Sequence, residues 1–316
     1  GMFPQIGTGF WYGKRWTGKS LAVDVELALA VANGTQFMGR DVIQGTVIVG
    51  LGEGLLDAGV RAQARLAREQ ADRIAKTAEA AVLYGDEVAM KWFKDLPPYT
   101  NDNLKYETKA FTLPVVRDDG EAEISRSMQS FINRAKKYDN LALVILDALP
   151  DFTGSLSISN DTSANRAMMG LKTLASELDC FVVVVAHPTE DGKKMLGAGR
   201  LGNAADVIVR SVPETDTDGD NRMVSTVTCE KNKYGKRFEP FSYIVKPCEY
   251  YQDVLDDNDE PTGETELVET ATIRLLDDEQ DELRPRRRKR PLPRLVDSSA
   301  PPRKRNGVLR SVAGRF

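Results

Sequence analysis

Short apolar runs recur along residues 1–252, and helical periodicity fills the stretches between them. The clearest runs have the length of a strand, at residues 46–51, 141–146 and 181–186. Apolar runs joined by amphipathic helices are typical of βαβ units in a parallel sheet that is covered on both faces. The pattern therefore predicts an α/β fold with a mostly parallel, twisted sheet of about seven to nine strands, flanked by helices.

The same pattern places the individual elements. Strands are expected at residues 9–12, 46–51, 141–146, 181–186, 206–212, 223–230 and 241–245. Apolar side chains at helical spacing predict helices at residues 19–32, 57–81, 121–137 and 165–178. Residues 84–120 show no sustained period, and their fold is left open.

Charge divides the chain into three parts that the net charge of -4 conceals. Residues 1–252 are nearly balanced and are expected to form the α/β domain. Residues 253–283 hold 13 acidic side chains against one basic, Arg274, and are expected to be an acidic segment with at most a weak hairpin. Residues 284–316 hold 12 basic side chains and too little apolar surface to fold, which predicts a disordered basic tail.

Composition narrows the class of protein further. A hydrophobic content of 41% with 28% charged residues excludes a collagen-like or wholly disordered chain. No apolar run approaches the roughly 18 residues that span a bilayer, so no membrane association is expected. The first residues lack the features of a secretion signal, and three scattered cysteines suit reduced thiols better than disulfides. These features favour a cytoplasmic location.

The strongest chemical signal is a glycine-containing turn between the first expected strand and the first expected helix. It reads Gly13-Lys14-Arg15-Trp16-Thr17-Gly18-Lys19-Ser20 and fits the pattern G-x-x-x-x-G-K-S. Glycines let backbone N–H groups surround a phosphate, Lys19 reaches the β- and γ-phosphates, and the Ser20 hydroxyl ligates Mg²⁺. We therefore expect ATP and Mg²⁺ here, bound by Gly13, Arg15, Trp16, Thr17, Gly18, Lys19 and Ser20. The alternative is a glycine turn that binds no nucleotide.

Two acidic residues at the ends of other strands suit the chemistry of such a turn. Asp147 directly follows an apolar strand and is expected to coordinate Mg²⁺ at the carboxyl edge of the sheet, the alternative being a helix cap. Glu53 lies between two glycines just past the strand at 46–51. It is positioned to activate the attacking water, the alternative being a solvated turn residue.

The strand at 181–186 leads into a histidine and a basic loop. His187, the only histidine of the chain, is expected at the same sheet edge as a sensor of the γ-phosphate; the alternative is a packed structural residue. The Gly-rich stretch 188–203 is expected to be a mobile loop. Its cations Lys193, Lys194 and Arg200 are candidate contacts to the backbone of a nucleic acid, or simply solvated charges.

Three further cations lie on the late strands. Arg210 follows the stretch Asp206-Val207-Ile208-Val209, and Lys231 and Lys233 follow the strand at 223–230. Cations in such positions can reach the nucleotide of a neighbouring subunit as trans-acting fingers. Each is otherwise an ordinary surface charge. Arg210 is the first candidate for the finger, and the two lysines are its alternatives.

With these residues in place, residues 5–247 resemble the RecA-like hexameric ATPases of the plasmid RepA replicative-helicase group, which are related to the DnaB-type helicases. The likeness extends beyond the turn to the stretch 20–34, to Phe37-Met38-Gly39-Arg40 and to Gly52-Glu53-Gly54. The resemblance implies a RecA-like core in which Glu53 is the catalytic base, His187 the sensor and Arg210 the arginine finger. In this chain Arg200 is displaced from the arginine of the corresponding loop in relatives, and residues 84–120 have no clear counterpart.

The expected function is an ATP-dependent DNA helicase or translocase that moves on single-stranded DNA in replication and assembles as a homo-oligomer, a hexameric ring. Two alternatives remain open. One is a RecA- or RadA-like ATPase of recombination or repair, and the other is a nucleotide-dependent scaffold that binds DNA without moving along it.

Overall fold

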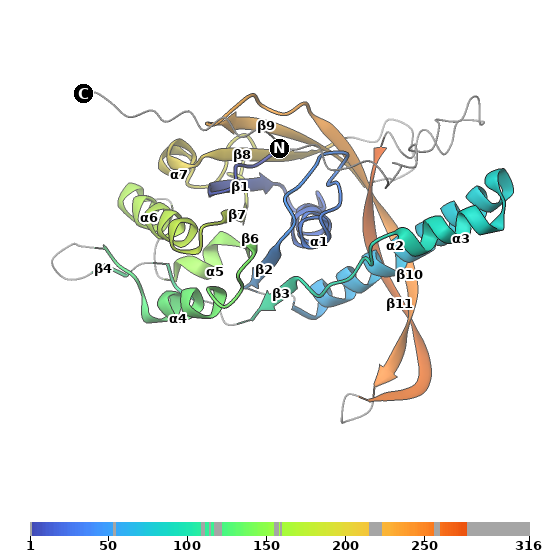
Figure 1. Ribbon diagram of the computed structural model, residues 1–316. Coiled ribbons are helices and arrows are strands. Elements are labelled where there is room, and N and C mark those ends of the chain that lie inside the picture. The colour runs from blue at the N-terminus through green and yellow to red at the C-terminus, as the bar shows by residue number, and fades with distance from the viewer. Residues whose placement is uncertain are drawn as a thin grey trace, which may run out of the picture.

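The computed structural model describes residues 2–52, 55–108, 111–113, 115–116, 122–154, 158, 160–214, 223–255 and 260–276. Its centre is a nine-stranded sheet with the strand order β11-β10-β9-β8-β1-β7-β6-β2-β3 (Figure 1). The expected mixed α/β fold with a mostly parallel sheet and flanking helices is confirmed. The basic segment 284–316 lies outside the described residues, and its disorder stays a prediction.

Six neighbouring strands form the parallel part of the sheet. They are β1 (Gly7–Gly13), β2 (Thr46–Leu51), β3 (Leu104–Glu107), β6 (Leu141–Asp147), β7 (Phe181–Ala186) and β8 (Val207–Pro213). Every residue of β2 and β7 is buried, which agrees with their continuous apolar sequences. In a parallel sheet the carboxyl ends of all these strands open at one edge, and that edge holds the candidate site.

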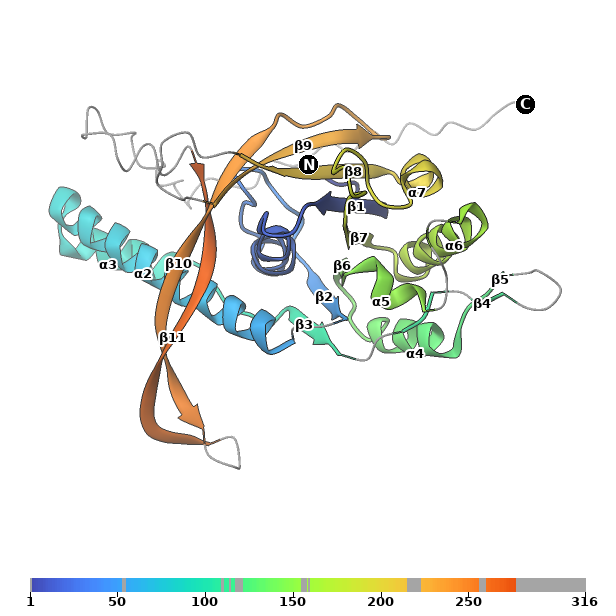
Figure 2. The same cartoon turned by 180° about the vertical axis from the view of Figure 1, so that it is seen from behind.

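The remaining three strands are antiparallel. They are β9 (Met223–Asn232), β10 (Phe241–Leu255) and β11 (Pro261–Leu275). The strand expected at 241–245 is much longer in the structure, because β10 pairs with β11 over nearly its whole length. The β10–β11 hairpin extends well past the other strands (Figures 1 and 2). It also spans residue 252, where the boundary between the domain and the acidic segment was expected.

The helices of the described residues are the π-helix η1 (Leu21–Leu27), α1 (Ala28–Asn33), α2 (Leu55–Tyr84), α3 (Asp86–Asp95), α4 (Arg126–Ala135), α5 (Leu149–Thr153), α6 (Asp161–Leu178) and α7 (Ala198–Ala204). Helices other than α3, which packs on α2, cover both faces of the parallel part. Two short strands, β4 (Val115–Val116) and β5 (Ala122–Glu123), form a separate pair. In the stretch 84–120, for which the sequence suggested no fold, α3 packs beside α2 and β3 joins the edge of the sheet.

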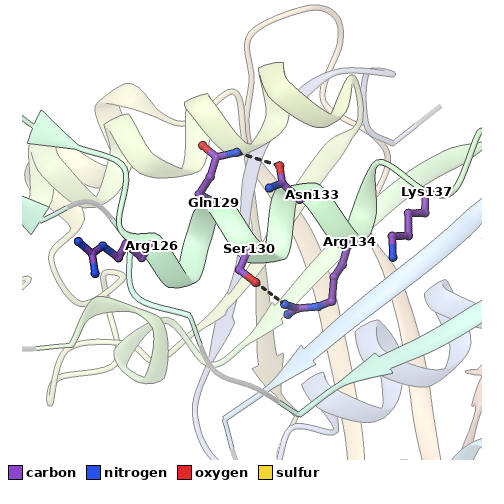
Figure 3. Close-up of a pocket in the computed structure, with 6 residues that line it drawn as sticks. All are labelled: Arg126, Gln129, Ser130, Asn133, Arg134 and Lys137. Carbon is purple, nitrogen blue, oxygen red and sulfur yellow. Dashed lines mark hydrogen bonds between the residues drawn. The ribbon is translucent and has the colours of Figure 1, made fainter.

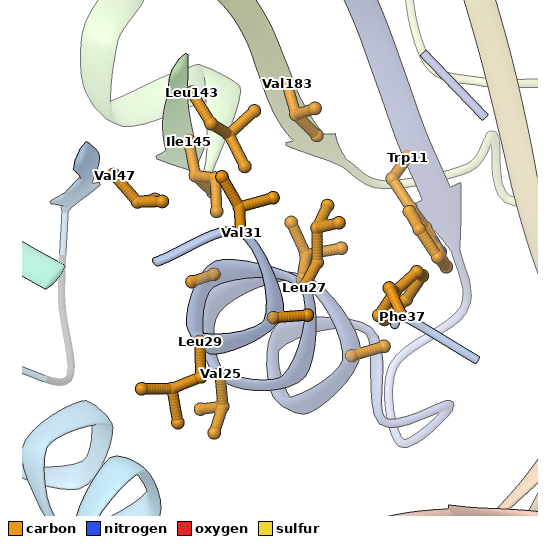
Figure 4. Packing of buried hydrophobic residues seen from close by; sticks show 14 of the residues in the cluster. Trp11, Val25, Leu27, Leu29, Val31, Phe37, Val47, Leu143, Ile145 and Val183 are labelled. Atoms are coloured by element: carbon orange, nitrogen blue, oxygen red, sulfur yellow. The ribbon is translucent and has the colours of Figure 1, made fainter. Parts of the chain in front are cut away.

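Each face of the sheet has its own apolar core. On one face η1, α1 and α2 pack on the strands, and Leu27 and Val31 lie among side chains such as Leu143 and Val183 (Figure 4). On the other face α4, α5, α6 and α7 cover the sheet. The strands are therefore held between two layers of helices, which fixes the positions of their carboxyl ends.

Candidate functional site

The turn after β1 has the backbone that the glycine motif requires. A side chain at Gly13 would place its Cβ only 2.4 Å from the carbonyl oxygen of Ser211 on the neighbouring β8. Gly18 has a φ of +71°, and a Cβ there would lie 2.8 Å from Val245. Glycine alone fits both positions without strain. At both glycines the backbone of the turn therefore packs directly against neighbouring strands of the sheet.

Hydrogen bonds from the antiparallel strands hold the middle of the turn. The carbonyl oxygen of Thr17 accepts from Ser225 Oγ at 2.9 Å and from Tyr243 Oη at 2.5 Å. Thr17 is buried, whereas Arg15 and Trp16 are exposed, and Trp16 shows 82% of its surface. Strands β9 and β10 therefore hold the middle of the turn, and the side chains of Arg15 and Trp16 are exposed to solvent.

The two residues expected to ligate Mg²⁺ meet in the structure. Ser20 Oγ donates a hydrogen bond of 2.6 Å to Asp147 Oδ2 at the end of β6. In the described part of the chain no group of three or more His, Cys, Asp and Glu side chains is arranged to hold a metal ion. Mg²⁺ in nucleotide sites usually takes one or two protein oxygens and completes its shell with phosphate and water. The pair of a hydroxyl and a carboxylate fits that ion.

Lys19 lies beside this pair with its ammonium group turned back on the turn. Its Nζ donates to the carbonyl oxygen of Lys14 at 2.8 Å, and only 6% of the residue is exposed. Burial lowers the pKa of Lys19, and the Asp147 carboxylate opposes that change. A phosphate that displaced the Lys14 carbonyl would supply a full negative charge to a cation that is already largely desolvated.

Asp24 is a buried acid of the site that sequence reasoning missed. It lies on η1, one turn beyond Ser20, and its Oδ1 atom has no hydrogen-bond partner. Burial and the nearby Asp147 carboxylate raise the pKa of Asp24 well above its usual range. The only sequence signal was an acid among the apolar residues of a helix, and placing it beside Asp147 requires the three-dimensional fold.

Glu53, the expected catalytic base, lies outside the described residues, and its role stays a prediction. The residue before it is described. Gly52 N donates to the carbonyl oxygen of Asp147 at 2.8 Å, so the chain leaves β2 directly beside Asp147. The approach is close, because a Cβ on Gly52 would lie 2.1 Å from Cγ of Asp151.

His187 reaches the same edge, at the end of β7. Burial and then the positive charge of Lys19 lower its pKa, while Asp147 acts in the opposite direction. The carbonyl oxygen of His187 accepts from Leu196 N at 2.9 Å, which ties the histidine to the stretch that follows.

The stretch 188–203 differs from the unpacked loop that was expected. Met195 and Leu201 are buried in the core, and the second half of the stretch forms the start of α7. The many glycines suggested a stretch that contributes nothing to the core. In the structure, however, the side chains of Met195 and Leu201 are both part of the core. Lys193 and Lys194 are exposed at a tight turn, whereas Arg200 pairs with Asp161 at 3.3 Å.

Arg210, the first candidate finger, is bound within its own subunit. Its Nη2 donates to the carbonyl oxygen of Gly192 at 2.9 Å, and Nη1 lies 3.6 Å from Glu230 Oε1. Glu230 also accepts from the hydroxyl of Tyr12 at 2.8 Å. Sequence reasoning missed Tyr12 and Glu230, because they come from β1 and β9 and meet only in the folded sheet.

The two alternative finger lysines are also engaged. Lys231 Nζ donates to the carbonyl oxygens of Gly202 and Asn203 at 3.0 and 2.8 Å, which caps the end of α7. Lys233 lies 3.5 Å from Asp206. Both lysines thus have a structural task in the described fold.

A glycine turn with the shape to surround a phosphate, a hydroxyl–carboxylate pair and a largely buried lysine, all at the carboxyl edge of a parallel sheet, are the features of a P-loop ATPase domain. A family model described as an AAA domain matches residues 1–193, and the chain belongs to that family. Among solved structures, one described as an ATPase domain is similar with a TM-score of 0.48 and 16% identity, over 76% of this chain and 82% of that chain. No curated protein sequence matches.

Proposed function

We propose that this protein is an ATP-dependent motor, a DNA helicase or translocase that couples ATP hydrolysis to movement on single-stranded DNA during replication. The observation that carries the ATPase part is the 2.6 Å contact between Ser20 Oγ and Asp147 Oδ2 beside the buried Lys19. The motor part rests on the link between His187 and the basic stretch that follows it.

The proposed chemistry divides among the strand ends. Gly13, Gly18 and the backbone between them surround the β-phosphate, and Lys19 neutralises the β- and γ-phosphates. Mg²⁺ would be held by Ser20 directly and by Asp147, and it would stabilise charge on the phosphates. In this proposal Glu53 activates the attacking water, and Arg15, Trp16 and Thr17 complete the contacts to the nucleotide.

The proposed coupling to DNA runs through the residues after β7. His187 senses the γ-phosphate, and its backbone carbonyl accepts from Leu196 N, so a shift of the backbone at His187 would displace the exposed turn that carries Lys193 and Lys194. Lys193, Lys194 and Arg200 would contact the phosphates of the strand. Arg200 exchanges its exposed ion pair with Asp161 for DNA at little cost, because exposed pairs contribute about 0–1 kcal/mol.

We propose that the motor is a homo-oligomer, a hexameric ring in the cytoplasm, in which Arg210 of one subunit completes the site of the next. Arg210 must then release the carbonyl of Gly192, which lies in the same stretch as the DNA-contacting lysines. Arrival of DNA and release of the finger would thereby be linked. Lys231 and Lys233 remain the alternatives for this role.

Within the described residues, no helix has the length and apolar character needed to span a bilayer.

The test is the rate of ATP hydrolysis with and without single-stranded DNA, in the wild type and in Lys19→Ala. The motor predicts stimulation of the wild type by DNA and loss of turnover in the variant, with Lys91→Ala on α3 as a matched control. A rate that DNA leaves unchanged contradicts the motor and favours a scaffold. Strand exchange without duplex unwinding favours a recombinase.

A further inference from the structure

The solvent-facing side of α4, together with Lys137 just beyond its end, forms a shallow basic groove, the α4 groove, that the proposed chemistry does not use. Its volume is about 370 Å³, and six side chains spaced three or four positions apart line it (Figure 3). They are Arg126, Gln129, Ser130, Asn133, Arg134 and Lys137. The opposite side of α4, with Met128, Phe131 and Ile132, is buried in the core. The helix therefore buries its apolar side in the core and presents a cationic side to solvent.

The charge of this groove is not balanced by its own helix. Residues 126–137 include no acid. Arg134 is paired with Glu107 at 2.9 Å, but Arg126 and Lys137 at the two ends are exposed. Their aliphatic stems and the amides of Gln129 and Asn133 suit a partner that combines acids with an aromatic ring, since arginine stacks on aromatic faces.

The outer half of the β10–β11 hairpin carries such a surface. Tyr251 and Leu267 are directly opposite each other and show 73% and 49% of their surfaces. Glu249 and Glu269 form the next pair on the same face, and both are exposed. Like charges directly opposite each other destabilise a ribbon unless a cation neutralises them. We call these four residues the hairpin face.

The hairpin face and the α4 groove lie at opposite ends of one molecule. The hairpin forms one edge of the sheet, whereas α4 packs over β2 and β6 toward the other edge. Views from the front and from behind both place them on opposite sides (Figures 1 and 2). The two surfaces cannot meet within a subunit. Complementary surfaces at opposite ends of a chain produce head-to-tail association, which closes into a ring or continues as a filament.

We propose that the hairpin face of one copy of this chain docks into the α4 groove of the next copy. Tyr251 and Leu267 pack on the aliphatic stems that line the groove, and the adjacent acids Glu249 and Glu269 lie in the positive field set up by Arg126 and Lys137 at its two ends. This inference rests on the proposed homo-oligomer and gives it an interface; it does not depend on movement along DNA.

Charge reversal on each surface tests the contact. The variants are Arg126→Glu with Lys137→Glu, Glu249→Lys with Glu269→Lys, and all four substitutions together. Arg134 is retained because it pairs with Glu107. The control reverses two exposed cations of α3, Lys91→Glu with Lys94→Glu. Subunit dissociation constants are measured by sedimentation velocity and mass photometry with an ATP analogue, at low and high salt, and circular dichroism verifies folding.

Each reversal should raise the dissociation constant at least tenfold, and the fourfold variant should return to within about threefold of the wild type. Salt should weaken the wild-type assembly, because the charges lie at an exposed rim. The control should match the wild type. Since every copy carries both surfaces, rescue by the fourfold variant is specific to a head-to-tail contact.

Other outcomes overturn the proposal in distinguishable ways. If the wild type assembles and neither charge reversal changes its assembly, the proposed interface is wrong. The proposed ring is unaffected by that outcome. A loss of affinity for single-stranded DNA in the α4 variant, with assembly unchanged, assigns the groove to nucleic acid instead. A wild type that stays monomeric with ATP analogue and DNA overturns both the interface and the proposed ring.

Discussion

The parallel and antiparallel parts of the sheet serve different ends. Strands β2 and β7 are buried along their whole length and end at the site that holds Ser20 and Asp147. The outer part of β10 and β11 is exposed, acidic and remote from that site. The chemistry thus depends on strands that are packed between two layers of helices. The exposed hairpin instead offers a surface that can bind another molecule. Four predictions test how far this division holds.

The largest expected difference concerns stability. Leu143→Ala on the buried β6 should lower the free energy of unfolding by about 2–5 kcal/mol, because it leaves a cavity between two helical layers. Leu267→Ala on the exposed hairpin should change it by less than about 0.5 kcal/mol when both variants are compared as monomers. Urea denaturation of both variants measures the contrast. Equal losses would show that the hairpin is as tightly packed as the parallel strands.

The second prediction concerns ATP turnover. Asp147→Asn removes the carboxylate that pairs with Ser20, and the rate of Mg²⁺-dependent hydrolysis should fall at least roughly 100-fold. The matched control is Asp253→Asn on the hairpin, which should leave the rate unchanged. The assay is steady-state hydrolysis over a range of Mg²⁺ concentrations. A rate within twofold of the wild type for Asp147→Asn would remove this residue from the metal site.

The third prediction uses the pH dependence of stability. Because the pKa of Asp24 is raised well above its usual range by burial and by Asp147, the folded protein keeps a proton that the unfolded chain releases above about pH 4. The wild type therefore loses stability, relative to Asp24→Asn, as the pH rises from 5 to 8. Denaturation at several pH values checks the sign. Curves that stay parallel would mean that Asp24 titrates normally in the folded protein.

The smallest expected effect concerns the contact between the antiparallel strand β10 and the nucleotide turn. Tyr243→Phe removes one of the two donors to the carbonyl oxygen of Thr17, which should lower the free energy of unfolding by about 0.5–1.5 kcal/mol and raise the KM for ATP. Tyr251→Phe, on the exposed end of the same strand, should change neither quantity. An unchanged KM in Tyr243→Phe would show that the turn keeps its shape without this bond.

The parallel strands were easier to predict from the sequence than the outer antiparallel strands. The parallel strands were predictable because burial on both faces leaves continuous apolar runs, such as 181–186. The strand β11 was expected only as part of a weak hairpin, because its outer residues alternate among Glu, Thr and Gly and resemble a solvated segment. Its inner end is held by a contact that no local pattern reveals, the bond from Arg68 on α2 to the carbonyl oxygen of Ile273.

In the site, too, local motifs and residues at strand ends could be predicted, whereas contacts between elements that are distant in sequence could not. The phosphate turn is contiguous in sequence, and Asp147 follows from the rule that polar residues at strand ends meet at one edge. Asp24 and the link from Tyr12 through Glu230 to Arg210 depend on which sides of η1, β1, β8 and β9 face each other. The internal partners of Arg210, Lys231 and Lys233 were hidden for the same reason.

The tyrosine that holds the nucleotide turn and the tyrosine at the exposed end belong to one continuous strand. Tyr243 and Tyr251 are both on β10, about 26 Å apart at the usual rise per residue. A force applied to the far end of the hairpin has a direct covalent path along β10 to the bond with Thr17, beside the paths through the paired strand β11 and its bond with Arg68 on α2. A pull on the exposed end of the hairpin would therefore be transmitted to the nucleotide turn.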